Sequence, residues 1–357
     1  MQLRDVRNSW ESQPLPYLLN RRGFALGGSA ATLAACAPSE RLYVNVYSAR
    51  HYDADRTLYA AFEEATGVAV RVLPANAEQL LERLRAEGEA TEADLVVAAD
   101  AGNLWRMQDA NLLAPVTSAA LSAGVPQRLH DPAGHWWGFT KRARIIVYRK
   151  DAVAPDEIAS MDNLTQPRFS GQVVARSSTN TYNLSLLASR IERLGADNAW
   201  DWAAGVRANF ARDPQGSDTD QIKAVAAGLA QVAIANHYYV LRMARSDDNA
   251  ERESAAKVGI VFPDQAGAGA HTNISGAGVA AHAKRPERAL QLLEYLVSDD
   301  AQRLLAPLND EFPIRPEIEA APELAALGAF REEDVALDAL GRRQGEAAAI
   351  YEEVGWR

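Results

Sequence analysis

Four tyrosines stand at places in the sequence where their hydroxyl groups could meet and bind a ligand. They are Tyr52, Tyr182, Tyr238 and Tyr239. They follow short apolar runs that predict β-strands, over residues 42–47, 172–175 and 232–235. In open α/β sheets, ligands bind outside the carboxyl ends of the strands, so we expect these side chains to line one crevice. Tyrosines inside predicted strands or helices are expected to be core aromatics instead: Tyr43, Tyr47, Tyr59 and Tyr148.

Several phenols in one crevice suit a hard, highly charged cation. Hard cations prefer oxygen ligands, whereas soft metals prefer thiolates. Because a phenol has a pKa of about 10, only a strongly polarising ion displaces its proton at neutral pH. Fe(III) meets that requirement, and tyrosinate is a known protein ligand of iron. Zinc or copper would be expected with more histidine and cysteine, and calcium or magnesium with more carboxylates. His51, beside Tyr52, is weak evidence by itself.

The elements that position these tyrosines alternate between strands and helices. Strands predicted over residues 68–73 and 95–99 are separated by stretches with helical spacing, and the first helix is expected to end at Gly67. After an extended run at residues 144–148 the alternation restarts, with a strand at 258–262. The last predicted helices cover residues 287–297 and 301–306. This alternation is typical of an α/β protein with a parallel sheet covered by helices on both faces.

Two such units in a chain of 357 residues agree with about two domains. No Pro/Gly/Ser-rich linker separates them, so we expect two lobes joined by crossing strands. The extended stretches 138–148 and 271–282 are the candidate crossings. The first lobe is predicted to take residues 41–140 plus 272–318, and the second residues 141–271 plus 319–357.

The N-terminal residues resemble an export signal. Arg21 and Arg22 precede a mildly apolar stretch of small residues, as in twin-arginine signals. Residues 33–36, Leu-Ala-Ala-Cys, resemble the lipobox of bacterial lipoproteins, in which the cysteine is acylated. We therefore expect residues 1–35 to be a signal peptide, and the mature protein to be periplasmic and anchored to a membrane through Cys36. The other interpretation is a disordered tail that ends in a chance cysteine.

Composition and motifs exclude several classes of protein. Cys36 is the only cysteine, which excludes disulfide frameworks and multi-cysteine zinc, haem or iron–sulfur sites. A net charge of −10 argues against a nucleic-acid partner, which requires a basic face. After the N-terminus, no stretch approaches the ~18 consecutive apolar residues of a membrane span. The chain lacks the G-x-S-x-G and H-E-x-x-H motifs and a strand-coupled G-x-G-x-x-G, so no enzyme is predicted.

Four segments carry a specific resemblance: residues 48–52 (SARHY), 176–183 (RSSTNTYN), 235–239 (ANHYY) and 271–278 (HTNISGAG). Over nearly all of residues 41–357, including DAGNLW at 100–105 and NDEFP at 309–313, the chain resembles the periplasmic ferric-ion-binding proteins of bacterial ABC importers. These are sometimes called bacterial transferrins, and this chain is most similar to the branch with a His-Tyr pair in the first loop. The resemblance implies a type II periplasmic binding fold and a membrane permease as partner; we expect a monomer.

The resemblance also implies roles for individual residues. It places iron ligation on Tyr52, Tyr182, Tyr238 and Tyr239, with His51 as an optional ligand. Arg142 matches an arginine near the metal, which could anchor a synergistic anion such as carbonate or balance the charge of the phenolates. A plain surface arginine is the alternative. His237 stands where relatives often have an uncharged, non-aromatic residue, so it is either a hydrogen-bond donor behind the ligands or exposed.

Two other functions fit part of the pattern. Relatives with the same fold bind polyamines, thiamine, phosphonates or sulfate, but those pockets use carboxylates, stacked aromatics or backbone amides. An exported redox metalloprotein is the other alternative, because twin-arginine substrates often fold around cofactors before export. A metal assay and a visible spectrum of the purified protein separate these alternatives from a ferric-ion-binding protein.

Overall fold

The computed structural model of the protein describes residues 42–50 and 52–357. The predicted signal peptide at residues 1–35, the predicted acylation site Cys36 and the optional ligand His51 therefore lie outside the described residues.

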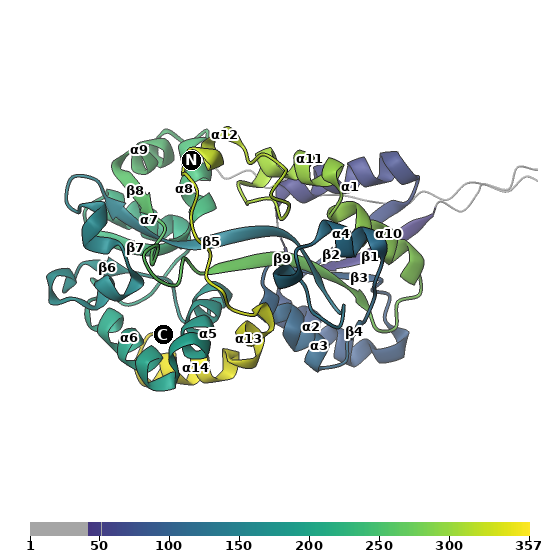
Figure 1. The fold of residues 1–357 in the computed structure, drawn as a ribbon, viewed down its shortest axis with the longest axis horizontal. Helices are drawn as coiled ribbons and strands as arrows, with labels where there is room; N and C mark the ends of the chain where they lie inside the picture. The colour runs from purple at the N-terminus through teal and green to yellow at the C-terminus, as the bar shows by residue number, and fades with distance from the viewer. Residues whose placement is uncertain (1–41, 51) are drawn as a thin grey trace, which may run out of the picture. The chain divides into compact units, whose positions relative to one another are not determined.

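The strands form one mixed sheet in the order β2–β1–β3–β9–β5–β7–β6, with β4 paired to β9 and β8 paired to β5. β1 is parallel to β2 and β3, and β6 is parallel to β7. The long strands β5 and β9 are antiparallel and lie side by side in the middle of the sheet (Figure 1). The strand bounds are β1 Tyr43–Ser48, β2 Ala69–Pro74, β3 Leu95–Ala98, β4 Leu113–Ala114, β5 Trp137–Arg149, β6 Val173–Val174, β7 Val232–Asn236, β8 Val258–Val261 and β9 Thr272–Ala280.

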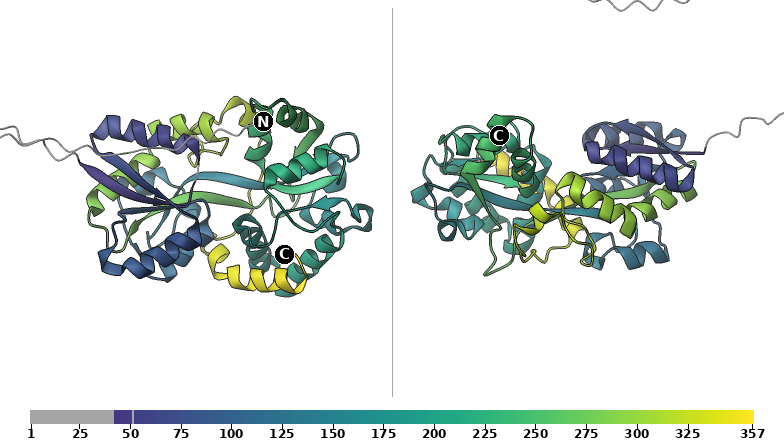
Figure 2. Two further views of the ribbon diagram at one scale, coloured as in Figure 1. Left: turned by 180° about the vertical axis from the view of Figure 1, so that it is seen from behind. Right: turned by 90° about the horizontal axis from the view of Figure 1, so that it is seen from above.

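Helices cover both faces of the sheet in each of two lobes (Figures 1 and 2). In the first lobe, α1, α10 and α11 lie on one face and α2 and α3 on the other. In the second lobe, α7, α8 and α9 lie on one face and α5, α6 and α14 on the other. The helix bounds are α1 Asp53–Thr66, α2 Ala77–Glu87, α3 Ala101–Asp109, α4 Ala119–Gly124, α5 Thr181–Leu194, α6 Ala196–Ala208, α7 Asp218–Ala226, α8 His237–Ala244, α9 Asn249–Lys257, α10 Pro286–Leu296, α11 Asp299–Asn309, α12 Pro322–Ala325, α13 Leu337–Arg342 and α14 Gln344–Glu353. Short 3₁₀ turns are Gly88–Ala90, Gln127–Leu129, Pro155–Ile158, Met161–Thr165 and Pro167–Phe169.

Alternating apolar residues of β7 show how the second lobe is built. Ile234 packs into the core beneath α5 and α6, whereas Ala233 and Ala235 pack into the core beneath α7 and α8. Because successive side chains of a strand point to opposite faces, this fully apolar strand supplies both cores at once. Each fully buried side chain of the size of Ile234 contributes about 1.5–3 kcal/mol. The first lobe has one core of its own, which includes Val96 and Leu292.

The α/β class expected from the sequence is confirmed, with one correction. The sheet is mixed and not parallel, because the two crossing strands β5 and β9 run antiparallel to each other. Gly67 ends α1 as expected, with a left-handed φ of 72° and its backbone N–H bonded to Glu63 O.

The two crossing strands, β5 and β9, join the lobes. They pair from Trp137↔Ala277 to Ala143↔Thr272, with a register shift between Gly138 and Thr140. Helix α13 packs against both α3 and α5, and its residues Leu337 and Leu340 enter the core of the first lobe. The residue ranges given above for the two lobes stay a prediction.

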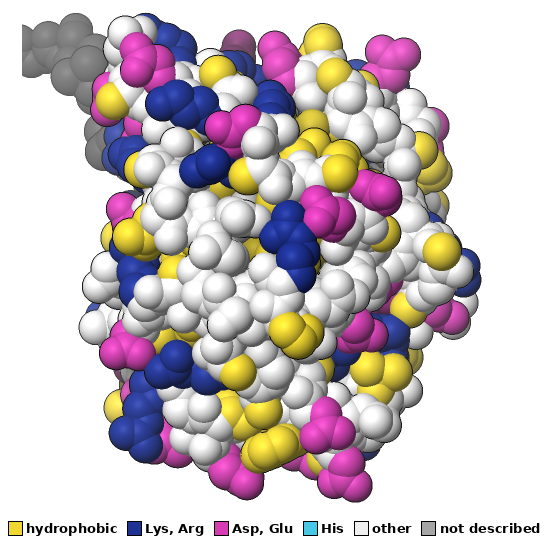
Figure 3. Space-filling view, turned by 90° about the vertical axis from the view of Figure 1, so that its left-hand side faces the viewer, with side chains coloured by type: hydrophobic (Ala, Val, Ile, Leu, Met, Phe, Trp, Pro, Cys, Tyr) yellow, Lys and Arg dark blue, Asp and Glu magenta, His cyan; other side chains and the backbone are white. Residues whose placement is uncertain are grey.

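The surface at the end of the second lobe, which carries β6 and α9, is mixed in character. Acidic, basic and apolar side chains are interspersed on it without a broad area of one charge (Figure 3). Among the residues that the structure describes, no helix combines the length and apolar character needed to cross a membrane.

Candidate metal centre

Three strand-to-helix junctions position the tyrosines. Tyr52 follows β1 and is the N-cap residue of α1. Tyr182 lies in the first turn of α5, where its backbone N–H donates to the side chain of the capping residue Asn180 at 3.2 Å. β7 runs directly into α8, so Tyr238 and Tyr239 lie in the first turn of that helix. The first junction belongs to the first lobe, and the other two belong to the second.

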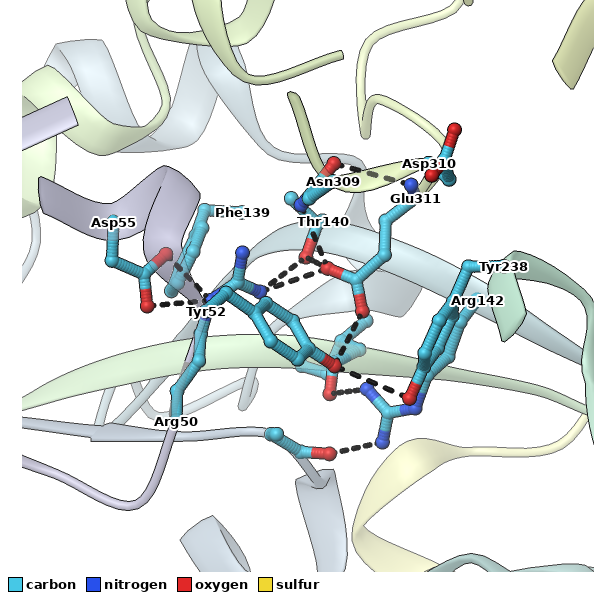
Figure 4. Close-up of polar contacts among 12 residues, drawn as sticks. Arg50, Tyr52, Asp55, Phe139, Thr140, Arg142, Tyr238, Asn309, Asp310 and Glu311 are labelled. Atoms are coloured by element: carbon cyan, nitrogen blue, oxygen red, sulfur yellow. Dashed lines mark hydrogen bonds and ion pairs between the residues drawn. The ribbon is translucent and has the colours of Figure 1, made fainter. Parts of the chain in front are cut away.

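The hydroxyl groups of three of these tyrosines meet between the lobes. Tyr238 Oη lies 3.3 Å from Tyr52 Oη (Figure 4). It also lies 3.3 Å from Tyr182 Oη. Tyr239 joins them through its ring, whose centroid lies 4.4 Å from that of Tyr238. These four residues are called the tyrosine cluster below. The structure thus brings together the side chains that the sequence placed at the strand ends, and their role as ligands stays a prediction.

Burial keeps the phenols of Tyr52, Tyr238 and Tyr239 protonated. Burial, followed by the influence of Tyr182 and Tyr52, raises the pKa of Tyr238 well above its usual value. Burial and the nearby carboxylate of Glu311 raise the pKa of Tyr52 in the same way. The pKa of Tyr239 is raised to about 12, chiefly by burial. Only an ion that polarises a phenol strongly can replace these protons at neutral pH.

A buried carboxylate lies against Tyr52. Glu311 Oε1 accepts a hydrogen bond from Tyr52 Oη at 3.4 Å, and its Oε2 accepts from Thr140 Oγ1 at 2.6 Å and Arg50 Nη1 at 2.8 Å (Figure 4). Burial alone would raise the pKa of Glu311, but the positive charges of Arg50 and Arg142 outweigh it and lower that pKa. Glu311 is therefore a carboxylate, held in place by three donors besides Tyr52, the third being Asn309 Nδ2 at 3.1 Å from its Oε2.

The three guanidinium groups nearest to the rings of the cluster are those of Arg50, Arg142 and Arg242. Arg50 Cζ and Arg242 Cζ lie 4.2 Å and 4.6 Å from the ring centroid of Tyr52. Arg142 Cζ lies 4.9 Å from the ring centroid of Tyr182. A cation against a ring face is attracted to it, and the attraction grows when the ring carries a phenolate. The site is therefore built to tolerate negative charge on the phenols.

Arg142 is buried, which excludes the surface arginine considered from the sequence. Its side chain is 2% exposed, Nη1 donates to Ile274 O at 2.8 Å, and Nη2 donates to Ala99 O. Nη2 also lies 3.5 Å from Asp100 Oδ2. Backbone carbonyls and one carboxylate thus fix this guanidinium beside Tyr182.

His237 is buried as well, so the exposed alternative for this residue is wrong. Its Nε2 lies 2.8 Å from Asp310 O, and its Nδ1 accepts from the backbone N–H of Ala143 at 3.2 Å. Burial lowers its pKa to about 4, so the ring is neutral and Nε2–H is the donor. His237 therefore ties the start of α8 to the segment after α11, behind Tyr238.

Two clefts open onto the tyrosine cluster. One of about 550 Å³ is lined by Tyr182 together with Arg176 and Asn103, and one of about 390 Å³ is lined by Tyr52 together with Arg242. Within residues 42–50 and 52–357, no group of three or more His, Cys, Asp or Glu side chains could hold a metal ion. The tyrosine cluster is therefore the candidate site for a hard cation in the described part of the chain.

Comparison with known proteins identifies the family. The model of the bacterial extracellular solute-binding proteins matches residues 57–332. Iron uptake protein A2 of Synechocystis is 42% identical over 347 residues, which are 95% of this chain and 99% of that protein. The chain belongs to the bacterial extracellular solute-binding proteins.

Solved structures of other solute-binding proteins agree with this family. The structure of Trichodesmium IdiA (FutA) in complex with iron and citrate ligands has a TM-score of 0.85 and 42% identity, over 88% of this chain and 100% of that one. The ferric binding protein of Campylobacter jejuni also has a TM-score of 0.85, with 37% identity over 88% of this chain and 100% of its own. The family and the fold predicted from the resemblance are confirmed.

Sequence reasoning missed two residues of this solute-binding protein's site. Arg50 and Glu311 are 261 positions apart, yet they form a fully buried ion pair against Tyr52. Both lie inside segments that carried the family resemblance, SARHY and NDEFP, but they were given no role. Their position inside those two segments is the signal in the sequence that points to them.

Proposed function

We propose that the protein binds Fe(III) between its lobes through the phenolates of Tyr52, Tyr182, Tyr238 and Tyr239, and delivers it to the permease of an ABC importer. The observation that carries this proposal is the meeting of three phenol oxygens from both lobes at distances of 3.3 Å. The names of the relatives, which are iron uptake and ferric binding proteins, support the same ligand. The protein is a solute-binding transport protein and not an enzyme.

The charges around the cluster favour a trivalent cation. Four phenolates and the carboxylate of Glu311 would place five negative charges in a buried site, which is costly without compensation. Fe(III) supplies three positive charges, and Arg50, Arg142 and Arg242 lie within cation–π distance of the rings. Hard oxygen donors also match a hard cation, whereas a site for zinc or copper would offer nitrogen or sulfur. His51 could add one nitrogen, as an optional ligand next to Tyr52.

We assign Arg142 to charge balance. Its two terminal nitrogens already donate to the carbonyls of Ile274 and Ala99, which leaves them poorly placed to hold a synergistic anion. If an anion such as carbonate accompanies the iron, Arg176 is the better candidate. Arg176 lines the cleft beside Tyr182, and its buried Nε has no hydrogen-bond partner among the described residues.

The site suits the competing ligands less well. A polyamine needs free carboxylates, but Glu311 and Asp100 are engaged by arginines, at 2.8 Å from Arg50 and 3.5 Å from Arg142. Phosphonate or sulfate would leave the phenol protons in place, and the carboxylate of Glu311, 3.4 Å from Tyr52 Oη, would repel such an anion. A redox metalloprotein would bind its metal permanently, whereas an importer protein must release it.

Titration of the metal-free protein with ferric citrate tests the proposal. Phenolate-to-iron charge transfer should give a visible absorption band that saturates at one iron per protein. Zinc, calcium and magnesium salts are the comparison and should neither give the band nor prevent it. Iron that binds without any visible band would rule out ligation by tyrosine.

We also propose that the protein reaches the periplasm by twin-arginine export and stays attached to a membrane through Cys36. Arg21-Arg22 and the Leu-Ala-Ala-Cys sequence at 33–36 support this proposal. A single acyl chain gives weak attachment, so the modified cysteine would carry further acyl chains. Cys36→Ser should release the protein from the membrane fraction of the native cell. Wild-type protein found wholly in the soluble periplasmic fraction would contradict the anchor.

A further inference from the structure

The first turn of α3 reaches across from the first lobe to the helix that carries Tyr182. Asp100 is the N-cap residue of α3, and its Oδ1 accepts from the backbone N–H of Gly102 at 2.8 Å. The same carboxylate is fully buried and accepts a hydrogen bond from Ser185 Oγ of α5, 2.9 Å from each oxygen. A residue that caps one helix thus also bonds a helix of the other lobe.

A second contact lies one turn away on each helix. Asn103 Nδ2 of α3 donates to Thr181 Oγ1 of α5 at 3.2 Å. Thr181 and Ser185 are four residues apart, so they lie on the same face of α5. Tyr182 follows Thr181 directly, and the two contacts therefore hold the turn of α5 from which Tyr182 projects. Asp100, Asn103, Thr181 and Ser185 are called the α3–α5 clasp below.

The clasp is also connected to the crossing strands. Asn273 Nδ2 of β9 donates to Asp100 Oδ2 at 2.8 Å, and Arg142 Nη2 of β5 lies 3.5 Å from that oxygen. The guanidinium of Arg142 in turn lies 4.9 Å from the ring centroid of Tyr182. A single carboxylate therefore fixes Tyr182 from two sides, through the backbone of α5 and through the cation beside its ring.

The backbone is shaped to permit this arrangement. A Cβ atom on Gly102 would lie 2.9 Å from Asp100 Oδ1 and 3.4 Å from the carbonyl carbon of Leu340 in α13. Any larger residue at this position would have to displace the carboxylate of Asp100. Capping alone requires no such burial, because most N-cap side chains work at the surface. Burying a carboxylate is costly, and the cost is offset here only by donors that come from both lobes and both crossing strands.

We propose that Asp100 and Asn103 are positioning residues that hold Tyr182 in the geometry needed to bind iron. The inference rests on the proposed function, because it assigns the clasp a role in the tyrosine site. The clasp does not touch the metal. It acts by keeping α5, and with it the phenol of Tyr182, docked against the first lobe that supplies Tyr52.

The chain offers a matched pair of variants for the test. Ser185 and Ser189 are both fully buried on α5, and each donates its hydroxyl to a buried carboxylate, Asp100 at 2.9 Å and Glu333 at 2.7 Å. Ser185→Ala and Ser189→Ala thus remove the same kind of bond, but only the first removes part of the clasp. The full-length variants are loaded with iron, and the release of iron to excess chelator is followed through the visible band. The melting temperature of each metal-free protein is measured in parallel.

Ser185→Ala should release iron roughly tenfold faster than Ser189→Ala, since hydrogen bonds around ligands typically change metal affinity by about 10–100-fold. Its visible band should also shift, because a displaced Tyr182 changes the phenolate–iron contact, while the two melting temperatures stay alike. Asn103→Ala breaks the other contact and serves if Ser185→Ala fails to fold. Equal release rates and identical bands in the clasp variants and Ser189→Ala would overturn the inference. A wild-type protein with no band at all would overturn the proposed function itself, which is a distinct result.

Discussion

Replacing Tyr238 by phenylalanine should leave the metal-free protein folded while it removes most iron binding. The substitution keeps the ring and deletes one hydroxyl in a fully buried position. That hydroxyl has contacts with Tyr52 Oη, Tyr182 Oη and Asn236 Nδ2, each at 3.3 Å. The usual O–H···O distance is about 2.7–2.8 Å, so these are weak bonds. The free energy of unfolding should therefore fall by no more than about 1.5 kcal/mol.

The effect on iron should be much larger than the effect on folding. Residues that merely orient a metal ligand typically change metal affinity by about 10–100-fold. Tyr238 would be a ligand at the centre of the cluster, next to both Tyr52 and Tyr182, so its loss should exceed roughly 100-fold. That factor corresponds to about 2.7 kcal/mol of binding free energy. The visible band should weaken as well, because one phenolate is missing.

Tyr351→Phe is the matched control for this variant. Tyr351 is also a fully buried tyrosine, and its hydroxyl donates to Asn183 O at 3.1 Å, outside the tyrosine cluster. Both variants and the wild type are titrated with ferric citrate, and their metal-free forms are unfolded in denaturant. The control should match Tyr238→Phe in stability to within about 1 kcal/mol and the wild type in iron binding. A Tyr238→Phe protein with the full band and unchanged affinity would refute the ligand assignment.

Three further predictions concern protons and lobe motion. Iron affinity should fall as the pH falls, because the raised pKa values of Tyr52 and Tyr238 mean that each phenol must release a proton to bind iron; an affinity independent of pH would contradict this. The pKa of His237 is lowered to about 4 in the folded protein, whereas a free histidine has a pKa of about 6.5. As the pH falls between these two values, the unfolded chain takes up a proton that the folded protein does not, so the free energy of unfolding should decline by up to about 3 kcal/mol. His237→Gln should flatten that decline, and a slope equal to that of the wild type would exclude His237 as its source. Fe(III) should lower the radius of gyration in small-angle scattering, because both lobes supply phenols, and an unchanged value would mean a preformed site.

Local patterns in the sequence were sufficient to predict most of the elements of the sheet, but not the helices α13 and α14 near the end of the chain. The strand expected at residues 232–235 is β7, Val232–Asn236, and the crossings expected at 138–148 and 271–282 are β5 and β9. Apolar runs and turn residues carry this information because the period of the hydrophobic pattern follows from backbone geometry. The antiparallel pairing of β5 with β9 could not be predicted in this way, since it depends on how the chain returns after more than a hundred residues.

The tyrosines of the site were predictable, but the charges around them were not. Tyr238 and Tyr239 stand directly after a strand, a position that local pattern alone identifies. Arg50 and Glu311 were invisible to the same reasoning, because a charged residue in a loop is usually solvated and nothing nearby in the chain marks these two as partners. Asp100 likewise was noted only as part of the segment DAGNLW, and nothing nearby in the chain points to its bond with Ser185 in the other lobe.

The ribbon formed by β5 and β9 lies beside the tyrosine cluster. Thr140 of β5 bonds Glu311 next to Tyr52, and Arg142 of β5 lies against the ring of Tyr182. If one lobe turned about this ribbon, each atom would travel a distance proportional to its separation from it. The rim of the cleft would therefore open by a larger distance than the distance by which the phenol oxygens separate. Water and a competing chelator would then reach the iron while most of its bonds were intact, and unloading would proceed by stepwise exchange of ligands.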